Sequence, residues 1–187
     1  MSARPQWRLW VKAIKCNGFE QHGQSGVASR LHGPEGKDNP VVTRLVPGTA
    51  MSAVIQETTQ IVGLILPSHA LHVFSDMEGF YGAYHPDPKY LWINKWRQDR
   101  FRKKPPANNA EWRVLDKTTT DRDVEITAGP PDEEDCTSWS ILDEVTAAAS
   151  AIANPRPQGE PVDERWSAAD EKAALDALHR HALSKGP

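Results

Sequence analysis

The alternation of apolar and polar positions predicts strands near the start of the chain. Trp7–Lys15 alternates with the period of a strand, and one face would carry Trp7, Leu9, Val11 and Ala13. Val41–Val46 is a second predicted strand, ended by Pro47-Gly48. Between them, Asn17–Asp38 contains five glycines and no period. We therefore expect a long loop there, of the kind that is often functional.

Thr49–Leu66 fits two structures. Thr49 can cap a short helix, because apolar residues and Thr58 follow it at helical spacing, namely Met51, Val54, Ile55 and Thr58. The competing hypothesis is a continuous strand through Leu66, because Gln60–Leu66 is nearly all apolar. Ala70–Ser75 would then pair with that strand across Pro67-Ser68. Two further short strands are predicted at Glu111–Leu115 and Asp123–Thr127.

The last third of the chain changes to a helical pattern. Pro130–Asp135 is an acidic break, and the spacing of Leu142, Val145 and several alanines predicts a helix over Ser138–Ala153. A polar linker is expected over 154–166 and a final helix over about 168–184. The predicted fold class is α+β. A β-rich, mostly antiparallel body over 1–129 precedes an acidic helical arm over 130–187.

Charge is distributed unevenly along the 187 residues. Lys89–Lys104, here called the basic–aromatic segment, carries a net charge of +6, whereas the whole chain carries −3. The rest of the chain must therefore carry −9. The segment interleaves cations with aromatic rings, and neither a helical nor a strand period separates the two. A helix lying on a membrane surface would need that separation, so this interpretation loses ground.

The basic–aromatic segment is the predicted partner-binding surface. Trp, Tyr and Arg dominate protein interfaces, and the same residue types neutralise phosphates and stack on bases. A third interpretation is that its Trp residues anchor the core beneath solvated cations. The acidic remainder of the chain would repel a polyanion and favours a protein partner or self-association. The predicted contact residues are Tyr90, Trp92, Lys95, Trp96, Arg97, Arg100, Arg102, Lys103 and Lys104.

Motifs for chemistry are sparse. The sequence lacks a phosphate loop, a dinucleotide fingerprint and a nucleophile elbow. Cys16 and Cys136 are two isolated cysteines and make neither a disulfide framework nor a zinc site. A metal-dependent hydrolase could be assembled only from a set scattered in sequence, His69, His72, Asp76 and His85. We expect no metal and no cofactor.

These observations favour a non-catalytic binding or assembly protein that docks on a protein partner through the basic–aromatic segment. It could be a structural or host-interfering component of a virus or mobile element. The alternatives are a nucleic-acid-binding protein that uses the same segment, and the hydrolase. The longest apolar run, Ile61–Leu66, is too short to span a bilayer. We expect no membrane partner and a cytoplasmic location, in the host cytoplasm or the virion if the protein is viral.

Overall fold

The computed structural model describes residues 4–17, 22–36, 39–87, 91–101 and 106–155. By its contacts the chain divides into two compact units, Met1–Pro155 and Arg156–Pro187. All described residues belong to the first unit.

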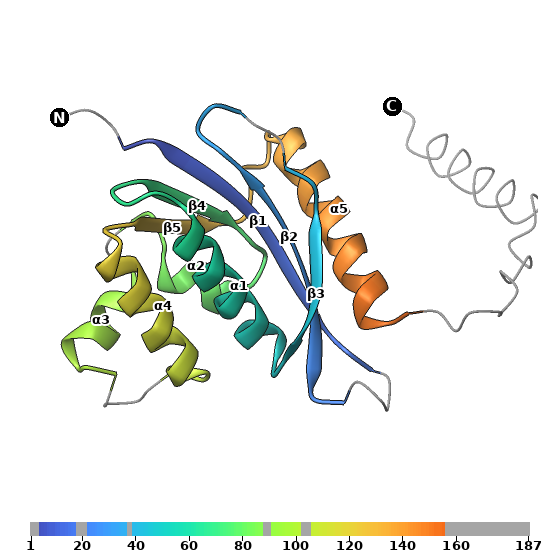
Figure 1. Ribbon diagram of the computed structural model, residues 1–187, viewed down its shortest axis with the longest axis horizontal. Coiled ribbons are helices and arrows are strands. Elements are labelled where there is room, and N and C mark those ends of the chain that lie inside the picture. Colours follow the sequence, from blue (N-terminus) through green and yellow to red (C-terminus); the bar gives the residue numbers. More distant parts are fainter. Residues whose placement is uncertain (1–3, 18–21, 37–38, 88–90, 102–105, 156–187) are drawn as a thin grey trace, which may run out of the picture. The chain divides into compact units, whose positions relative to one another are not determined.

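A five-stranded mixed sheet forms the centre of this unit (Figure 1). The strand order is β3-β2-β1-β4-β5. The pairs β1/β2 and β2/β3 are antiparallel, whereas β1/β4 and β4/β5 are parallel. The strands are β1 (Gln6–Lys15), β2 (Gln24–His32), β3 (Val42–Pro47), β4 (Ala70–Phe74) and β5 (Glu125–Gly129).

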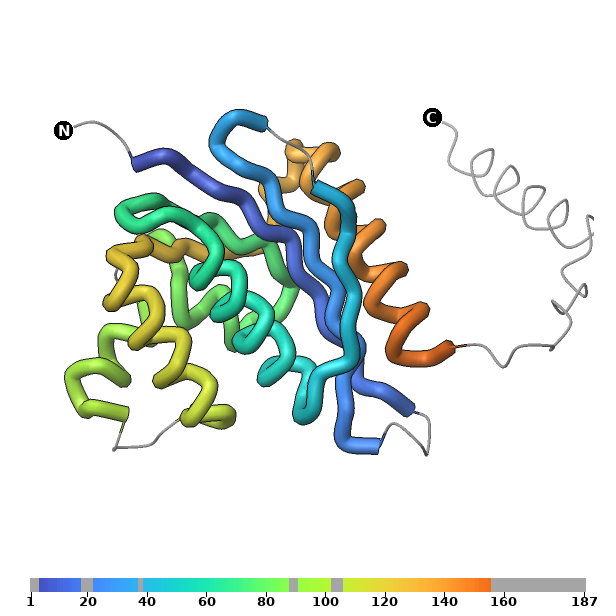
Figure 2. The backbone as a smooth tube through the Cα atoms, in the orientation of Figure 1, coloured from blue at the N-terminus to red at the C-terminus, as the bar shows by residue number. Residues whose placement is uncertain are grey.

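Helices cover both faces of the sheet (Figure 2). One face packs against α1 (Ala50–Leu64), with α2 (Glu78–Ala83), α3 (Trp92–Gln98) and α4 (Asn109–Asp121) on the same side. The other face packs against α5 (Cys136–Ala153), which contacts β1, β2 and β3. The expected α+β fold class is confirmed, and so are the helix over Ser138–Ala153 and the strands at Trp7–Lys15, Val41–Val46 and Asp123–Thr127.

The alternation along β1 supplies both hydrophobic cores. Leu9 and Val11 are fully buried on the α1 side. Trp10 points to the other face, where it joins Ile141, Leu142 and Val145 of α5. A central strand with both faces covered needs apolar residues on both, which explains why Trp10 is as deeply buried as its neighbours.

The helical interpretation of Thr49–Leu66 is confirmed and the strand interpretation is wrong. The Thr49 hydroxyl accepts a hydrogen bond from the Ser52 amide at 3.1 Å and caps α1. Ile61 and Val62 continue the buried stripe of Val54 and Ile55 at helical spacing. Within Gln60–Leu66, Ile61, Val62 and Ile65 are buried, whereas Leu64 and Leu66 are exposed. β4 consequently pairs with β1 and β5 rather than with that segment.

The loop expected over Asn17–Asp38 is also wrong, because β2 occupies Gln24–His32. Its Val27 and Ala28 point to opposite faces and are both fully buried, so the strand shows no alternation. Gly26 lies where α5 crosses, and a Cβ there would be 2.7 Å from the Ala153 nitrogen. The glycine therefore permits close approach of a helix to the sheet.

The strand predicted at Glu111–Leu115 is wrong, since these residues lie within α4. Trp112, Leu115 and Thr119 are its buried residues and follow helical spacing. The predicted final helix over 168–184 lies outside the described residues, as does the predicted linker beyond Pro155. None of the helices in the described part of the chain is long and apolar enough to cross a membrane.

Candidate functional site

The sheet has one point at which its connections diverge. From β1 the chain continues to β2 and β3 on one side, whereas β4 is followed by β5 on the other. β1 and β4 are adjacent and parallel, so their carboxyl ends lie together at this point. In open sheets with parallel strands, ligands bind outside the carboxyl ends at such a switch point. The topology therefore directs attention to the last residues of β1 and to those that follow β4.

Two opposite charges meet at this position. Trp10 is paired with Phe74 in the β1/β4 register, and two residues further along each chain segment Lys12 forms an ion pair with Asp76. The Lys12 side chain is 19% exposed, whereas that of Asp76 is 45% exposed. The ammonium is thus partly shielded, and one side of the carboxylate faces solvent. We call this pair, Lys12 and Asp76, the switch-point pair.

An open cavity lies on the sheet face that α5 only partly covers, and neither member of the switch-point pair lines it. Its volume is about 680 Å³. Phe74 forms part of its wall and stacks on Trp10, with ring centroids 5.0 Å apart. Arg8 lines it, and three carboxylates come from the loop that leads into α5: Asp132, Glu133 and Asp135. The cavity therefore joins aromatic surface to charges of both signs.

His72 is the titratable group on the sheet floor of this cavity. Its Nδ1 lies 2.8 Å from the Thr127 hydroxyl on β5, and its ring meets Phe74 edge-on at 4.5 Å. Burial lowers the pKa of His72, the positive charge of Arg8 lowers it further, and Asp132 acts in the opposite direction. The imidazole is therefore neutral at neutral pH and can accept or donate a hydrogen bond.

The hydrolase set suggested by the sequence does not converge on one point. Trp7 Nε1 donates to His69 Nδ1 at 2.8 Å, and Trp7 packs against the core on the α1 side. His72 lies on the opposite face and shares the 680 Å³ cavity with His85, while Asp76 is engaged by Lys12. Among the described residues no group of three or more His, Cys, Asp or Glu could hold a metal ion.

The structure places part of the basic–aromatic segment in α3. Ile93 is buried, Trp96 lies 5.4 Å from Trp112 between ring centroids, and Phe101 is 6% exposed. The apolar residues thus anchor α3 to α4. The cations Lys95, Arg97 and Arg100 are exposed. Of the predicted contact residues, Tyr90, Arg102, Lys103 and Lys104 lie outside the described part of the chain, and Trp92 is 38% exposed.

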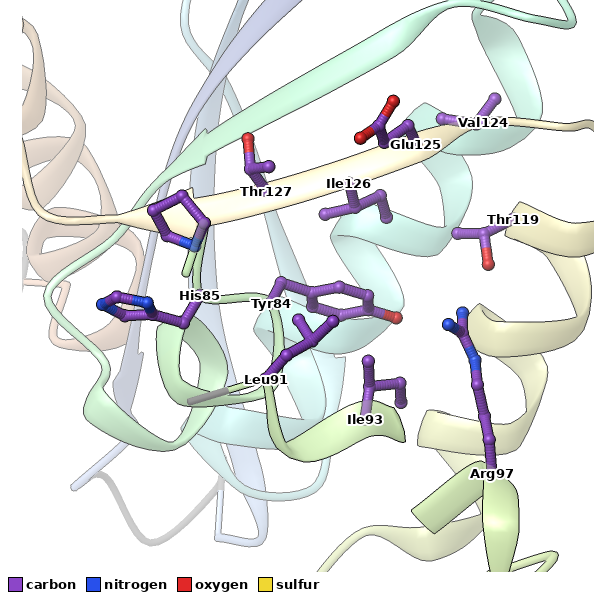
Figure 3. Close-up of a pocket in the computed structure, with 11 residues that line it drawn as sticks. Tyr84, His85, Leu91, Ile93, Arg97, Thr119, Val124, Glu125, Ile126 and Thr127 are labelled. Carbon is purple, nitrogen blue, oxygen red and sulfur yellow. The ribbon is translucent and has the colours of Figure 1, made fainter. Parts of the chain in front are cut away.

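A second, smaller cavity of about 230 Å³ lies between α3 and β5 (Figure 3). Leu91, Ile93 and Ile126 give it apolar walls, and the Tyr84 hydroxyl and Arg97 guanidinium face its interior. It adjoins the larger cavity, because His85 and Pro86 line both.

Sequence reasoning missed the switch-point pair. Lys12 and Asp76 are 64 positions apart, and neither belongs to a recognisable motif. The available signal was a lysine between Trp10 and Ile14 on a face of a predicted strand that also carries Arg8. A charge between apolar residues on a face that is to be covered needs a partner, but its identity depends on strand order.

Neither a family model nor a curated protein sequence matches this chain. Solved structures do share its fold. The native protease–reverse transcriptase of prototype foamy virus superposes with a TM-score of 0.59 and 14% identity, over 82% of this chain and 22% of that one. The foamy viral protease–reverse transcriptase in complex with an RNA/DNA hybrid gives a TM-score of 0.53 and 15% identity, over 77% and 20%.

The RNase H domain of prototype foamy virus, solved in solution, gives a TM-score of 0.52 with 17% identity. The match covers 81% of this chain and 93% of that domain. This chain thus spans about a fifth of the length of the protease–reverse transcriptases but nearly all of the isolated domain. The fold of the described unit is RNase H-like.

These similarities correct the main functional expectation. A non-catalytic protein that docks on a protein partner through the basic–aromatic segment was predicted, chiefly because the acidic remainder of the chain would repel a polyanion. The solved structures that share the fold include an RNase H domain and protease–reverse transcriptases, so that expectation is wrong. Net charge failed as a guide because it describes solubility and long-range repulsion and does not describe the local surface that meets a ligand.

Proposed function

We propose that this chain is a nucleic-acid-processing protein whose RNase H-like unit binds an RNA/DNA hybrid or a related duplex. The observation that carries the proposal is the position of Lys12 and Asp76 at the topological switch point of a fold shared with an RNase H domain. A fold neighbour was solved with an RNA/DNA hybrid and another with double-stranded DNA, which supports a duplex as the ligand.

The cations on one face of β1 suit the backbone of a nucleic acid. Arg8 lies four residues before Lys12 on β1 and points to the same face, where it lines the open cavity. Lysine and arginine side chains that neutralise phosphates release condensed counterions, which supplies much of the affinity for nucleic acid. Asp76 holds the Lys12 ammonium in a fixed position before the ligand arrives.

The basic–aromatic segment supplies a second contact in this proposal. Its apolar residues Ile93, Trp96 and Phe101 pack inward, so the exposed cations Lys95, Arg97 and Arg100 are presented from an anchored element. A rigid element loses little conformational entropy on binding. The anchoring also explains why neither a helical nor a strand period separated the apolar from the basic residues of the segment. The described part of the segment is a short helix followed by a turn, so no single period applies along its whole length.

Hydrolysis of a phosphodiester bond is the second candidate function, favoured by the similarity to an RNase H domain. A divalent metal at the switch point would need several oxygen ligands. Asp76 contributes one carboxylate, which is already engaged in the ion pair with Lys12. In the described ranges no further acidic or histidine side chains complete a group of three. The residues present therefore do not fit a metal at this position, and we draw no catalytic step through one.

Fluorescence anisotropy with a labelled RNA/DNA hybrid tests the main proposal. Binding should weaken steeply with added salt, and Lys95→Glu should weaken it about five- to tenfold, as expected for the loss of a phosphate contact. Arg4→Glu is the matched control, because Arg4 precedes β1 at the opposite end of the strand from Lys12. A protein that binds neither the hybrid nor duplex DNA at low salt would overturn the proposal.

The same samples decide the second candidate. Cleavage of the labelled strand is followed on a denaturing gel with Mg²⁺ and with a chelator. Cleavage that disappears in Asp76→Asn would support hydrolysis at the switch point. Binding without cleavage under either condition would remove the hydrolase and leave the binding function.

A further inference from the structure

The smaller cavity contains a buried hydroxyl with no protein partner. Tyr84 is 3% exposed, and its hydroxyl has no hydrogen-bond partner among the described residues. In Figure 3 the hydroxyl points into the cavity, toward the guanidinium end of Arg97. An unsatisfied buried hydroxyl destabilises the fold, because it loses its hydrogen bonds to water without replacing them. Such a group in the wall of a cavity indicates a position that a ligand atom can fill.

The tyrosine is held firmly in this orientation. Its carbonyl accepts a hydrogen bond from the Ala128 amide of β5 at 2.8 Å. Its ring packs against Phe80 and Trp112, with centroids 5.8 Å and 6.2 Å away. Burial raises the pKa of Tyr84, and the nearby Asp116 raises it further. The hydroxyl therefore remains protonated at all ordinary pH values and is available as a donor.

The polar groups around the hydroxyl favour a neutral ligand over an anion. Arg97 Nε already donates to Asp116 Oδ1 at 2.5 Å, so much of its charge is balanced. Glu125 also lines the cavity, but its carboxylate points away from Tyr84 in Figure 3. Leu91, Ile93 and Ile126 supply apolar walls, and Thr119 adds an uncharged polar group. A planar ring with one carbonyl oxygen matches this surface, since it offers apolar area and a single acceptor.

Size and position restrict the ligand further. Cavities for drug-sized ligands measure about 300–1,000 Å³, and this one measures about 230 Å³, which suits a single ring system. Leu91, Ile93 and Arg97 bring the basic–aromatic segment to its rim. Enzymes that extrude a base from a duplex bind it in a pocket of this kind, between apolar side chains and with hydrogen bonds to its edge.

We propose that this cavity accepts one unpaired pyrimidine base, whose carbonyl oxygen accepts a hydrogen bond from the Tyr84 hydroxyl. The inference deepens the proposed function and rests on it, because the base would belong to the nucleic acid bound along α3 and the sheet. It adds a preference for a duplex with an extruded nucleotide over a fully paired one.

Three labelled RNA/DNA hybrids test the proposal by anisotropy: one fully paired, one with a single bulged thymidine and one with an abasic site at the bulge. The wild-type protein should bind the thymidine bulge at least about fivefold more tightly than the abasic bulge, since the base adds ring burial to one net hydrogen bond. Tyr84→Phe should remove the hydrogen bond, lower affinity for the thymidine bulge about fivefold and leave the fully paired hybrid unaffected. Thr59→Val is the matched control, because it removes a hydroxyl from α1, and no α1 residue lines either this cavity or the larger one.

A measurement on the ligand side requires no protein variant. Replacing the bulged thymine with difluorotoluene keeps its shape and removes its carbonyl oxygens, and should lower affinity about fivefold, as Tyr84→Phe does. Equal affinity for the thymidine and difluorotoluene bulges would overturn the inference, as would a preference for thymidine over difluorotoluene that Tyr84→Phe retains. If no hybrid binds, the proposed function fails. Free thymidine is then titrated against the intrinsic tryptophan fluorescence, and a response lost in Tyr84→Phe would still support the cavity as a base site, whereas no response would overturn it.

Discussion

Lys12 of β1 and Asp76, two residues beyond β4, form an ion pair across the two strands at which the connections of the sheet diverge. The pair brings together segments 64 positions apart. The Lys12 side chain is mostly buried, so the protein holds the ammonium in place. The Asp76 side chain is half-exposed, so another anion can replace its carboxylate beside Lys12. In the proposed function, a phosphate of the bound duplex competes with Asp76 for that ammonium.

This competition predicts opposite effects for the two partners. Lys12→Ala should weaken binding of an RNA/DNA hybrid about tenfold. The slope of log K against the logarithm of salt concentration should become shallower by about one for each lost phosphate contact. Asp76→Asn should strengthen binding, because it removes a competing carboxylate from Lys12.

The matched control is the exposed pair Arg4–Asp123 near the start of β1. Arg4→Ala and Asp123→Asn change the same charges away from the switch point and should leave affinity nearly unchanged. If Lys12→Ala and Arg4→Ala lower the affinity equally in an anisotropy titration, Lys12 contributes only to the net charge of the protein and makes no specific phosphate contact.

A buried network on the α1 side should contribute substantially to stability. Glu57 is 5% exposed, accepts from the Ser29 hydroxyl at 2.6 Å and accepts from Arg44 Nε at 2.6 Å. Glu57→Gln exchanges a charged acceptor for a neutral amide beside a guanidinium and should lower the free energy of unfolding by about 2 kcal/mol. Urea denaturation measures this as a lower midpoint with an unchanged m-value.

Glu144→Gln is the comparison variant for this network. Glu144 pairs with Arg30 at 2.5 Å, but its side chain is 55% exposed, and exposed ion pairs contribute at most about 1 kcal/mol. If Glu144→Gln lowers the free energy of unfolding as much as Glu57→Gln does, burial is not the reason for the effect at Glu57.

Two glycines should respond oppositely to alanine. At Gly26 a new Cβ would be 2.8 Å from the Ala149 oxygen and from Ile152 Cγ2, so α5 must shift. Gly26→Ala should cost about 1–3 kcal/mol of unfolding free energy, as overpacking does. Gly63 lies in α1 with nothing within 4 Å of such a Cβ, and Gly63→Ala should stabilise by about 0.5–1 kcal/mol through helix propensity. Thermal denaturation distinguishes the two directions, and a stabilising Gly26→Ala would contradict the packing described for α5.

The partly buried His72 should make stability depend on pH. Its pKa in the folded protein lies below the usual value of 6.5, chiefly because of burial. The unfolded chain therefore binds the proton more readily, and stability is lost as the pH falls below 6.5 towards the folded value. His72→Gln keeps a hydrogen-bonding side chain beside Thr127 but cannot titrate. The unfolding free energy of the wild type should fall more than that of the variant between pH 7.5 and 5.5, and parallel curves would contradict the assignment.

Local signals determined several elements from the sequence alone. β1 was predictable because alternation along Trp7–Lys15 is a property of neighbouring residues, and α1 because Thr49 caps a stripe at helical spacing. The helix over Ser138–Ala153 was predictable for the same reason. The charge contrast of the basic–aromatic segment is likewise fixed by the order of its residues.

Only the tertiary structure decided the rest. β2 shows no alternation because both its faces are buried by α1 and α5, so its strand character comes from its neighbours in the sheet. Packing between helices leaves the Tyr84 hydroxyl without a hydrogen-bond partner among the described residues. It also turns Ile93 and Trp96 inward while Lys95 stays exposed. Lys12 and Asp76 meet because β4 adds parallel to β1, a long-range pairing that no local pattern encodes. The sequence thus determined the local elements and the distribution of charge, whereas strand order and packing decided where charges, cavities and the candidate site lie.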